Sequence, residues 1–347
     1  MIKLDSIVAV SKEILVAVGV RKQDAEYIAK TIRYANLLGL YTHGIGRVPL
    51  YVKNIRANTL VPDTNMPVVQ EEGAMALIDA GNGFGQVAAG KAIDIGVRKA
   101  KEYVVSAVGV RNSNNIGTLG FFGRSAAEEG MICLVFANAA PAVAPPGGFC
   151  PIFGTNPLCV ALPGSGHEPP IVFDMATTVA ARGKIRLAAK KGVKIPLDWA
   201  VDAKGQPTDD PHEALKGTLL PIGGYKGFGL SLMVDVLAGM LTGAAFGGAV
   251  RQLSDTSAPS KSGNLFIFMD PSKFLGEEGY QKRLDQLLNN VRACCKEGDL
   301  YLPGDSYTKK LQDNVQAVTL PEVQITEINE LAKSLGLAVR LQRETGD

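Results

Sequence analysis

Strand-like and helix-like segments alternate between residues 75 and 270, and this alternation limits the chain to α/β architectures. Apolar runs of strand length occupy 75–79, 104–110, 132–136, 157–162, 171–173 and 265–269. Helical periodicity occupies the stretch from Gly85 to about Tyr103, and then 119–129, 175–191 and 226–243. There is no internal repeat. We therefore expect one α/β core with helices packed on its sheet.

Amphipathic helices without intervening strands are predicted at both ends of the chain. They cover 6–18 and 23–38 at the start, and 276–297 and 321–336 at the end, where Pro321 and Glu322 form a helix-start signal. The pattern predicts two domains. Residues 1–70 with 275–347 would form a helical domain, and residues 71–274 would form the α/β domain.

Composition excludes several classes of protein. The 347 residues carry a formal net charge of +2 and only 6 % aromatic residues, so neither nucleic acid nor a membrane surface is expected as a partner. The five cysteines contain no C-x-x-C pair, so neither a disulfide framework nor a metal site is expected, and Cys133 and Cys159 read as core residues. The first residues lack the apolar stretch of a signal peptide, which favours a cytoplasmic protein.

The segment Tyr41–Arg47 (YTHGIGR) combines a histidine with an arginine four residues later. Histidine exchanges protons near neutral pH, and arginine can grip a carboxylate through two parallel hydrogen bonds. Together they suit the reduction of a 2-oxo acid. The alternative interpretation is structural: a helix ends near Leu38, and both side chains decorate the turn that follows.

Two glycine-containing segments suggest anion binding, but no Gly-x-Gly-x-x-Gly fingerprint is present. Gly85–Lys91 imitates a nucleotide-hydrolase loop, yet Ala92 follows where a hydroxyl is needed, so we interpret it as part of a helix. Gly223–Gly229 precedes a long apolar helix and contains Lys226. It is either an anion site at a helix start or a flexible turn.

Eight segments, in order along most of the chain, resemble the malate/L-lactate dehydrogenase family of type-2 NAD(P)-dependent oxidoreductases. They are Thr42–Arg47, Asp79–Ala88, Val110–Gly117, Phe153–Pro157, Asp174–Thr177, Ala181–Ile185, Gly224–Gly229 and Leu302–Gly304. The resemblance favours the catalytic interpretation of His43. It implies a non-Rossmann cofactor domain with a mixed, largely antiparallel sheet, and a helical domain for substrate and dimerisation.

The resemblance also implies a role for each matching residue. His43 would be the proton donor, with Thr42 beside it and Asp174 orienting it and raising its pKa. Arg47 would face the substrate carboxylate. NAD or NADP would lie along a set of residues from three segments: Asp174, Met175, Ala176, Thr178, Lys226, Pro303, Gly304 and Asp305. The expected partners are a small carboxylate substrate and a second copy of the chain.

The chain departs from the family pattern at two positions where histidine is common. These positions hold Asn115 and Asn264. An amide can hydrogen-bond substrate or nicotinamide, but it cannot deliver a proton. Asn115 could alternatively cap a helix. The remaining histidines, His167 and His212, look like surface residues, so His43 is the one candidate for acid–base work.

Three functions remain open. The first is an NAD(P)-dependent dehydrogenase of a small 2-hydroxy acid. The second is a reductase of a cyclic 2-imino acid such as pyrroline-2-carboxylate or piperideine-2-carboxylate, whose nitrogen arrives already protonated. The third is an inactive paralogue that binds dinucleotide, which the joint presence of His43, Arg47, Asp174 and Lys226 disfavours.

Overall fold

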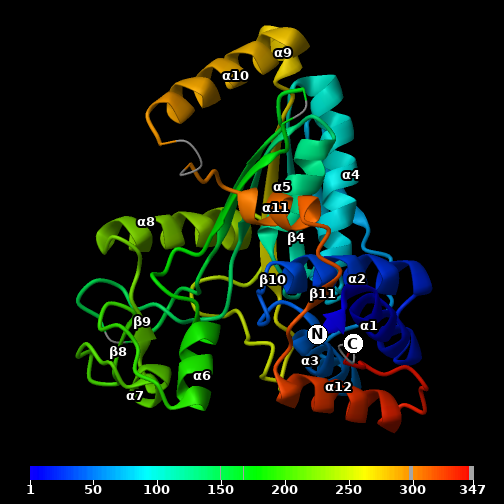
Figure 1. The fold of residues 1–347 in the computed structure, drawn as a ribbon, viewed down its shortest axis with the longest axis vertical. Helices are drawn as coiled ribbons and strands as arrows, with labels where there is room; N and C mark the ends of the chain where they lie inside the picture. The colour runs from blue at the N-terminus through cyan, green and yellow to red at the C-terminus, as the bar shows by residue number, and fades with distance from the viewer. Residues whose placement is uncertain (149, 167, 297–299, 344–347) are drawn as a thin grey trace.

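The molecule is built around one seven-stranded sheet (Figure 1). The computed structural model describes residues 1–148, 150–166, 168–296 and 300–343. The strand order across the sheet is β2 (Val68–Glu72), β3 (Met75–Asp79), β4 (Val105–Ser113), β10 (Ser262–Met269), β5 (Ile132–Ala137), β6 (Leu158–Leu162) and β7 (Ile171–Met175). Only β3 and β4 run parallel, and every other neighbouring pair is antiparallel. The expected mixed, largely antiparallel sheet is therefore confirmed.

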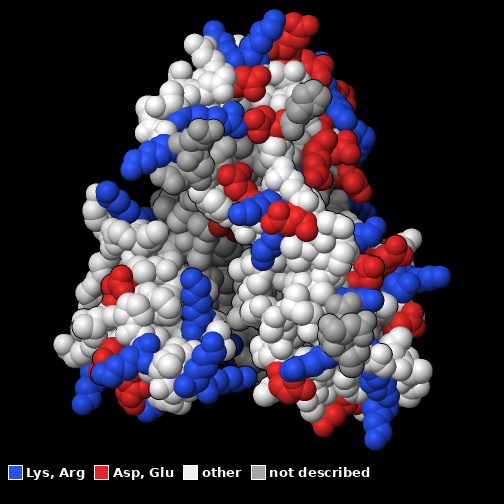
Figure 2. Space-filling model, viewed as in Figure 1, with Lys and Arg blue, Asp and Glu red and all other residues white. Residues whose placement is uncertain are grey.

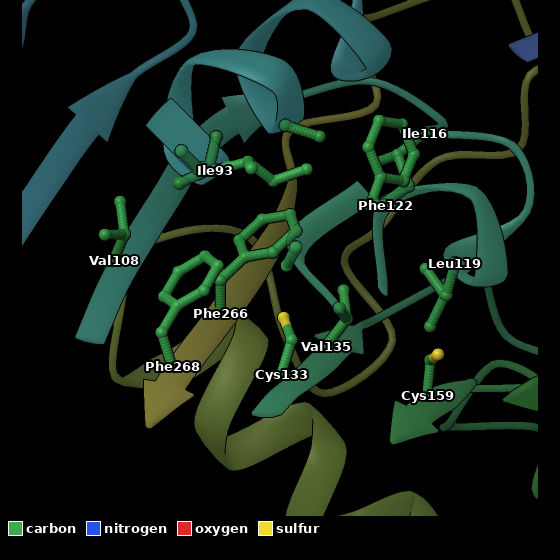
Figure 3. Close-up of a cluster of buried hydrophobic side chains, with 14 of the residues drawn as sticks. Ile93, Val108, Ile116, Leu119, Phe122, Cys133, Val135, Cys159, Phe266 and Phe268 are labelled. Carbon is green, nitrogen blue, oxygen red and sulfur yellow. The ribbon is translucent and has the colours of Figure 1, made fainter. Parts of the chain in front are cut away.

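Two helices cover one face of this sheet and enclose its core. They are α4 (Gly85–Tyr103) and α5 (Leu119–Glu128). Figure 3 shows Phe266 and Phe268 of β10 beneath them, with ring centroids 6.3 Å apart. Gly96 of α4 admits the Phe268 ring, because a Cβ at Gly96 would lie 2.0 Å from it. Cys133 and Cys159 lie in the same core as free thiols, as expected.

The two ends of the chain pack together beside the sheet. A second core joins α1 (Leu4–Ala17), α2 (Lys22–Leu37), α3 (Val48–Arg56) and α12 (Glu322–Ser334). The strand β1 (Ile2–Lys3) pairs with β11 (Ala317–Val318), which brings the described ends of the chain side by side (Figure 1). This cluster matches the helical layer expected from the termini, while the domain boundaries themselves stay a prediction.

One helix of the carboxyl-terminal part lies elsewhere. The chain passes through α9 (Ser272–Leu275) and α10 (Glu277–Ala293) at the end of the sheet far from α1, then returns through α11 (Asp305–Gln312) (Figure 1). Tyr280 of α10 donates to the carbonyl of Pro163. Arg292 pairs with Glu168 at 2.8 Å. These contacts join α10 to the segment between β6 and β7, so it does not pack in the terminal cluster with which it was grouped.

A small lobe, here called the α6 lobe, projects from the sheet edge. It consists of α6 (Arg182–Lys191), β8 (Ala200–Val201), α7 (Pro211–Lys216) and β9 (Thr218–Leu219), and it has a small buried core of its own. The helix predicted for 175–191 begins only at Arg182. Met175 still pairs with Leu158 in the sheet, and Thr178 forms a bridge to Pro221. Extended pairing therefore replaces helix in a stretch that includes the β-branched Thr177 and Thr178.

The most apolar helix changes its geometry halfway. It begins as α8 (Tyr225–Val234) and continues as a π-helix, η2 (Asp235–Met240), before ending near Gly243. The buried Asp235 accepts a hydrogen bond from the N–H of Gly247 at 2.7 Å. This polar anchor fits a helix packed inside protein. No helix within the described ranges is long and apolar enough to cross a membrane.

Candidate active site

Figure 2 shows a deep hollow between the α6 lobe and the terminal helices, with Lys and Arg side chains along its α6 rim. The segment 41–47, here called the His43 loop, connects α2 with the short 3₁₀ turn η1 (Ile45–Arg47) and then α3. The added-Cβ contact between Gly183 and Thr42, 2.3 Å, shows that the first turn of α6 lies against this loop. The His43 loop and the predicted segment Ala181–Ile185 therefore meet at the hollow.

The His43 loop is held rigidly from beneath by Asn36 of α2. The buried Asn36 accepts a hydrogen bond from the N–H of Ile45 at 2.8 Å. Gly44 sits directly on this amide, since a Cβ at that position would lie 2.4 Å from Asn36 Oδ1. Only glycine fits there, which explains the glycine that follows the histidine.

The imidazole of His43 is half-buried, and its Nδ1 lies 3.0 Å from the Thr42 hydroxyl. Burial, and to a lesser extent the positive charge of Arg47, lower the pKa of His43 to about 3. The expectation that a carboxylate raises this pKa is wrong. The charge that acts on His43 is the cation of Arg47, and the imidazole of the free protein is therefore neutral at pH 7.

Arg47 is held by the same loop. Its Nε donates to the carbonyl of Thr42, which leaves the two terminal nitrogens of the guanidinium for another partner. No carboxylate among the described residues pairs with it. Burial lowers the pKa of Arg47 below its usual value, and the positive charge of Arg186 acts in the same direction. Tyr51 raises this pKa, but its effect is smaller than that of burial. An unpaired, partly buried guanidinium favours an anionic ligand.

The opposite wall of the hollow is cationic as well. Arg182, at the start of α6, donates to the carbonyl of Leu215 at 3.1 Å, and Arg186 follows one turn later. Arg186 lies close enough to lower the pKa of both Arg47 and Arg182 by charge repulsion, after the larger effect of burial. Arg186 therefore lies near both Arg47 and Arg182, where the first turn of α6 packs against Thr42.

Asp174 lies at the end of the edge strand β7, against the start of α5. Its Oδ2 accepts the N–H of Gly120 at 2.7 Å. Part of the residue is exposed, but the surrounding protein encloses its carboxyl group, and this enclosure raises its pKa to about 6. No hydrogen bond joins Asp174 to His43 within the described ranges. Its role as the residue that orients His43 stays a prediction.

The predicted cofactor segments meet along β7. Pro303 accepts the N–H of Val172 at 2.9 Å, and the Asp305 carboxylate accepts the N–H of Leu302 at 2.7 Å. Gly304 has φ +98°, a conformation that other residues rarely adopt, and a Cβ there would lie only 3.0 Å from the Val172 nitrogen.

The start of α8 lies beside the segment that follows β7. A Cβ on Gly227 would lie 2.7 Å from the carbonyl oxygen of Thr177, so α8 packs directly on this segment. Thr178 Oγ1 is occupied by the carbonyl of Ala180 at 2.9 Å. Lys226 is exposed, and no carboxylate in the described chain pairs with it. Met175, Ala176, Lys226 and the 303–305 turn are thereby brought to one edge of the sheet.

The two asparagines that replace family histidines occupy different environments. Asn115 is half-buried, and its Oδ1 accepts the N–H of Gly117 at 3.1 Å in the loop before α5. The capping position of α5 is Thr118, so the helix-capping interpretation of Asn115 is wrong. Asn264 is only 1 % exposed, and neither its amide nitrogen nor its amide oxygen has a hydrogen-bond partner.

The other predictions about motifs can be placed briefly. Gly85–Lys91 lies inside α4, with Gly90 against the Tyr27 ring and Lys91 donating to the carbonyl of Met66, so its interpretation as helix is confirmed. His212 is exposed at the start of α7, as expected. His167 lies outside the described residues.

Sequence reasoning missed three residues of the site: Tyr34, Gly120 and Arg186. The buried Tyr34 reaches Asp174 from α2, because a Cβ on Gly120 would lie 3.1 Å from the Tyr34 hydroxyl and 3.2 Å from Asp174 Oδ2. No local pattern could have revealed that meeting of three elements. Arg186 could have been found, because it stands four residues after Arg182 on one helix face.

The sequence pattern of the malate/L-lactate dehydrogenase family matches residues 2–329. The chain belongs to this family. A relative in the malate/L-lactate dehydrogenase family, L-sulfolactate dehydrogenase of Methanothermobacter thermautotrophicus, is 37 % identical over 336 residues, which cover 96 % of this chain and 97 % of the relative. Other relatives have names that specify NAD⁺ or NADP⁺.

Two solved structures of the family are similar throughout their length. Sulfolactate dehydrogenase from Methanocaldococcus jannaschii has a TM-score of 0.90 at 33 % identity, covering 97 % of this chain and 98 % of that one. The Δ¹-piperideine-2-carboxylate reductase from Pseudomonas syringae has a TM-score of 0.86 at 30 % identity, covering 96 % and 99 %. One architecture thus supports both hydroxy-acid and imino-acid enzymes.

Proposed function

We propose that this chain is an NAD(P)-dependent oxidoreductase that interconverts a small 2-hydroxy acid and the corresponding 2-oxo acid. The observation that carries the proposal is the His43 loop, in which a neutral imidazole adjoins an arginine without a carboxylate partner. Oxidation of a hydroxy acid needs a base for the hydroxyl proton and a cation for the carboxylate. His43 and Arg47 supply these two groups from one rigid segment.

Thr42 would control the tautomer of His43. When its hydroxyl donates to Nδ1, the imidazole carries its proton on Nε2; when it accepts, the proton stays on Nδ1. A base that removes the substrate's proton through Nε2 needs the second arrangement. Substrate binding would also change the charge balance, because a carboxylate on Arg47 offsets the cation that lowers the pKa of His43.

The sheet edge at β7 fits a nicotinamide dinucleotide. Lys226 would hold a phosphate, and Asp174 with Met175, Ala176 and Thr178 would lie along the cofactor opposite Pro303, Gly304 and Asp305. Support comes from the unpaired charge of Lys226 and from Gly304, where the chain approaches β7 closely. The cofactor supplies the hydride acceptor or donor. Asn115 would hydrogen-bond the substrate or the carboxamide.

A homodimer is proposed through the exposed side of α8, η2 and the turn that follows them. Five apolar side chains there face solvent: Leu230, Met233, Met240, Leu241 and Phe246. Asp235 is the one charged residue between Lys226 and Arg251, and it is buried. Exposed apolar side chains in a segment without exposed charges are typical of an interface between subunits.

Reduction of a cyclic 2-imino acid is the second candidate. Two observations favour it: the pKa of His43 is about 3, and an amide stands at position 115. A protonated imine needs no acid when hydride reaches its carbon, whereas a 2-oxo acid does. The structural similarity to the piperideine-2-carboxylate reductase is compatible with this chemistry.

The decisive assay measures NADH and NADPH oxidation with oxaloacetate, pyruvate and pyrroline-2-carboxylate side by side. We expect turnover with at least one 2-oxo acid, and a fall of about a hundredfold or more in kcat for His43→Ala, because a positioned acid or base contributes about this much. NAD(P)H binding, followed by fluorescence, should be unchanged. Turnover of the imine alone would select the second function. Full activity of His43→Ala would remove His43 from the mechanism.

A further inference from the structure

Tyr34 of α2 is a buried tyrosine whose hydroxyl group lacks a hydrogen-bond partner. The residue is only 5 % exposed, and its hydroxyl makes no hydrogen bond within the described ranges. Buried polar groups are nearly always paired, because an unpaired one destabilises the fold. Burial raises the pKa of Tyr34 above its usual value; Arg124 lowers this pKa and Asp174 raises it. The phenol is therefore neutral, and its hydroxyl can both donate and accept.

The hydroxyl lies beside the carboxyl group of Asp174, at the start of α5. A Cβ on Gly120 would lie 3.1 Å from the Tyr34 hydroxyl oxygen and 3.2 Å from Asp174 Oδ2, so the two oxygens stand around one point. Asp174 also accepts the N–H of Gly120 at 2.7 Å. Part of Asp174 is exposed, which gives a ligand access to this place.

Aromatic contacts hold the Tyr34 ring between α5 and α11. The ring meets Phe121 of α5 edge-on, with centroids 5.6 Å apart, and lies 4.5 Å from the ring of Tyr307 in α11. Helix α11 begins at Asp305, in the turn proposed above for the cofactor. Tyr34 therefore lies between β7 and the helix that follows this turn, where Figure 1 shows α2, α5 and α11 close together.

Charge decides which part of a dinucleotide fits beside Tyr34. The start of a helix attracts anions, but the Asp174 carboxylate already occupies the start of α5 and would repel a phosphate. A carboxylate next to a neutral phenol instead suits two neighbouring alcohol groups, because it accepts their protons while the phenol donates or accepts. In a dinucleotide, such a pair is the 2′- and 3′-hydroxyl of a ribose.

We infer that Tyr34 is a further cofactor-binding residue, and that its hydroxyl and the Asp174 carboxyl together hold the two hydroxyls of one ribose of NAD(P). The inference rests on the proposed function, which places Asp174 along the cofactor. It adds a residue of the terminal helices to a site otherwise built at the sheet edge. Since α2 leads into the His43 loop, the bound ribose would contact the same helix that positions the imidazole.

The test compares Tyr34→Phe with Tyr27→Phe, a matched control on the same helix. Tyr27 also packs edge-on against Phe121, with centroids 5.9 Å apart, and burial raises its pKa as well. Each variant loses one hydroxyl and keeps its ring, so both should fold as the natural chain does, which the thermal unfolding temperature checks.

NADH and NADPH binding is measured by fluorescence titration. In Tyr34→Phe, the Kd of the preferred dinucleotide should rise about threefold to tenfold, the range expected for one neutral hydrogen bond. In Tyr27→Phe it should stay within about twofold. An unchanged Kd in Tyr34→Phe, or an equal rise in both variants, would overturn the inference.

Asp174→Asn tests whether the two residues hold the same ribose. If they do, Tyr34→Phe should raise the Kd less in the Asp174→Asn background than in the natural chain, because the two groups act together. Effects that simply multiply would refute the shared site. ADP, which carries only the adenosine ribose, identifies the ribose: weaker ADP binding by Tyr34→Phe assigns the adenosine ribose, and a loss confined to the complete dinucleotide assigns the nicotinamide ribose.

These binding measurements separate the inference from the proposed function, since none of them needs turnover. The Kd may rise in Tyr34→Phe alone, in a protein that neither oxidises a hydroxy acid nor reduces an oxo acid. That result would leave the ribose site standing and refute the proposed function. Turnover of a 2-oxo acid with the same Kd in Tyr34→Phe and the natural chain would do the reverse.

Discussion

The two walls of the hollow are built differently. The His43 loop rests on the large core of the terminal helices, where Asn36 and Gly44 leave it no freedom. The α6 lobe rests on a separate and smaller core, to which Ala142 and Val143 contribute from the segment between β5 and β6. This contrast suggests that the rigid wall carries the chemistry, whereas the α6 lobe can change and move more readily, because a small core resists change less.

The largest effect of a single substitution is expected at Arg47, on the rigid wall. Arg47→Lys keeps the charge but loses the planar fork that holds a carboxylate through two bonds, and the ammonium cannot also reproduce the bond to the Thr42 carbonyl. We expect the KM for every carboxylate substrate to rise about tenfold or more, with kcat much less affected. Steady-state kinetics with oxaloacetate and 2-oxobutanoate measure this.

Arg47→Lys should affect both substrates alike, because both carry a carboxylate next to the reacting carbon. An unchanged KM would show that the guanidinium faces something other than substrate. A loss confined to oxaloacetate would mean that Arg47 binds the second carboxylate of oxaloacetate and not the one next to the reacting carbon.

A second prediction tests the contact between the walls. Gly183→Ala places a methyl group where only 2.3 Å separates it from Thr42 Cγ2, so α6 or Thr42 must move and the Thr42–His43 hydrogen bond is disturbed. We expect kcat to fall severalfold, to roughly a fifth, through misplacement of the imidazole. Gly229→Ala in α8 is the matched control, because nothing lies within 4 Å of a Cβ there.

The same contact offers a rescue. Thr42→Ser removes the methyl group that collides and keeps the hydroxyl that faces His43 Nδ1. The double variant Gly183→Ala, Thr42→Ser should therefore recover most of the lost turnover. If the turnover of the double variant instead falls by the product of the two single effects, the close contact at Thr42 does not transmit the effect of Gly183→Ala to His43.

The sequence predicted what depends on neighbours along the chain. The strand 75–79 was expected with the limits that β3 has, and α4 and α5 with ends within about a residue, because glycines separate β3 from α4 and flank α5. The helix prediction was wrong over residues 175–181, because pairing with Leu158 and Pro221, far away in sequence, sets the conformation of this segment. The position of α10 likewise depends on contacts with Pro163 and Glu168.

The candidate site likewise has features that the local sequence predicts and others that depend on distant contacts. A motif could identify His43, Arg47 and Asp174 as a group, but it could not show which charges lie close enough to shift their pKa values. The pKa of His43 depends on burial and on Arg47, while Asp174 meets Gly120 and Tyr34 instead. Electrostatics of this kind follows from the packing of three elements and cannot be obtained from residue types and spacing alone.

The smallest expected effect is the change of kcat/KM with pH that is due to His43. It tests the electrostatics of the rigid wall. The kcat/KM for hydroxy-acid oxidation reports ionisations of the free protein, where the base must be neutral. With an ordinary pKa near 6.5, the neutral fraction would fall about thirtyfold between pH 8 and pH 5. A pKa lowered to about 3 keeps His43 neutral throughout this range, so the change due to His43 should stay below about twofold.

Asp174 must be separated from this measurement, because enclosure raises its pKa to about 6, within the same window. Asp174→Asn removes that titration and keeps an oxygen that can accept the Gly120 N–H. Low residual activity suffices, since only the shape of the profile matters. An inflection near pH 6 that disappears in Asp174→Asn belongs to Asp174. An inflection near pH 6.5 that persists would show that His43 titrates normally, and the rigid wall would then lack the burial and cationic charge that distinguish it here.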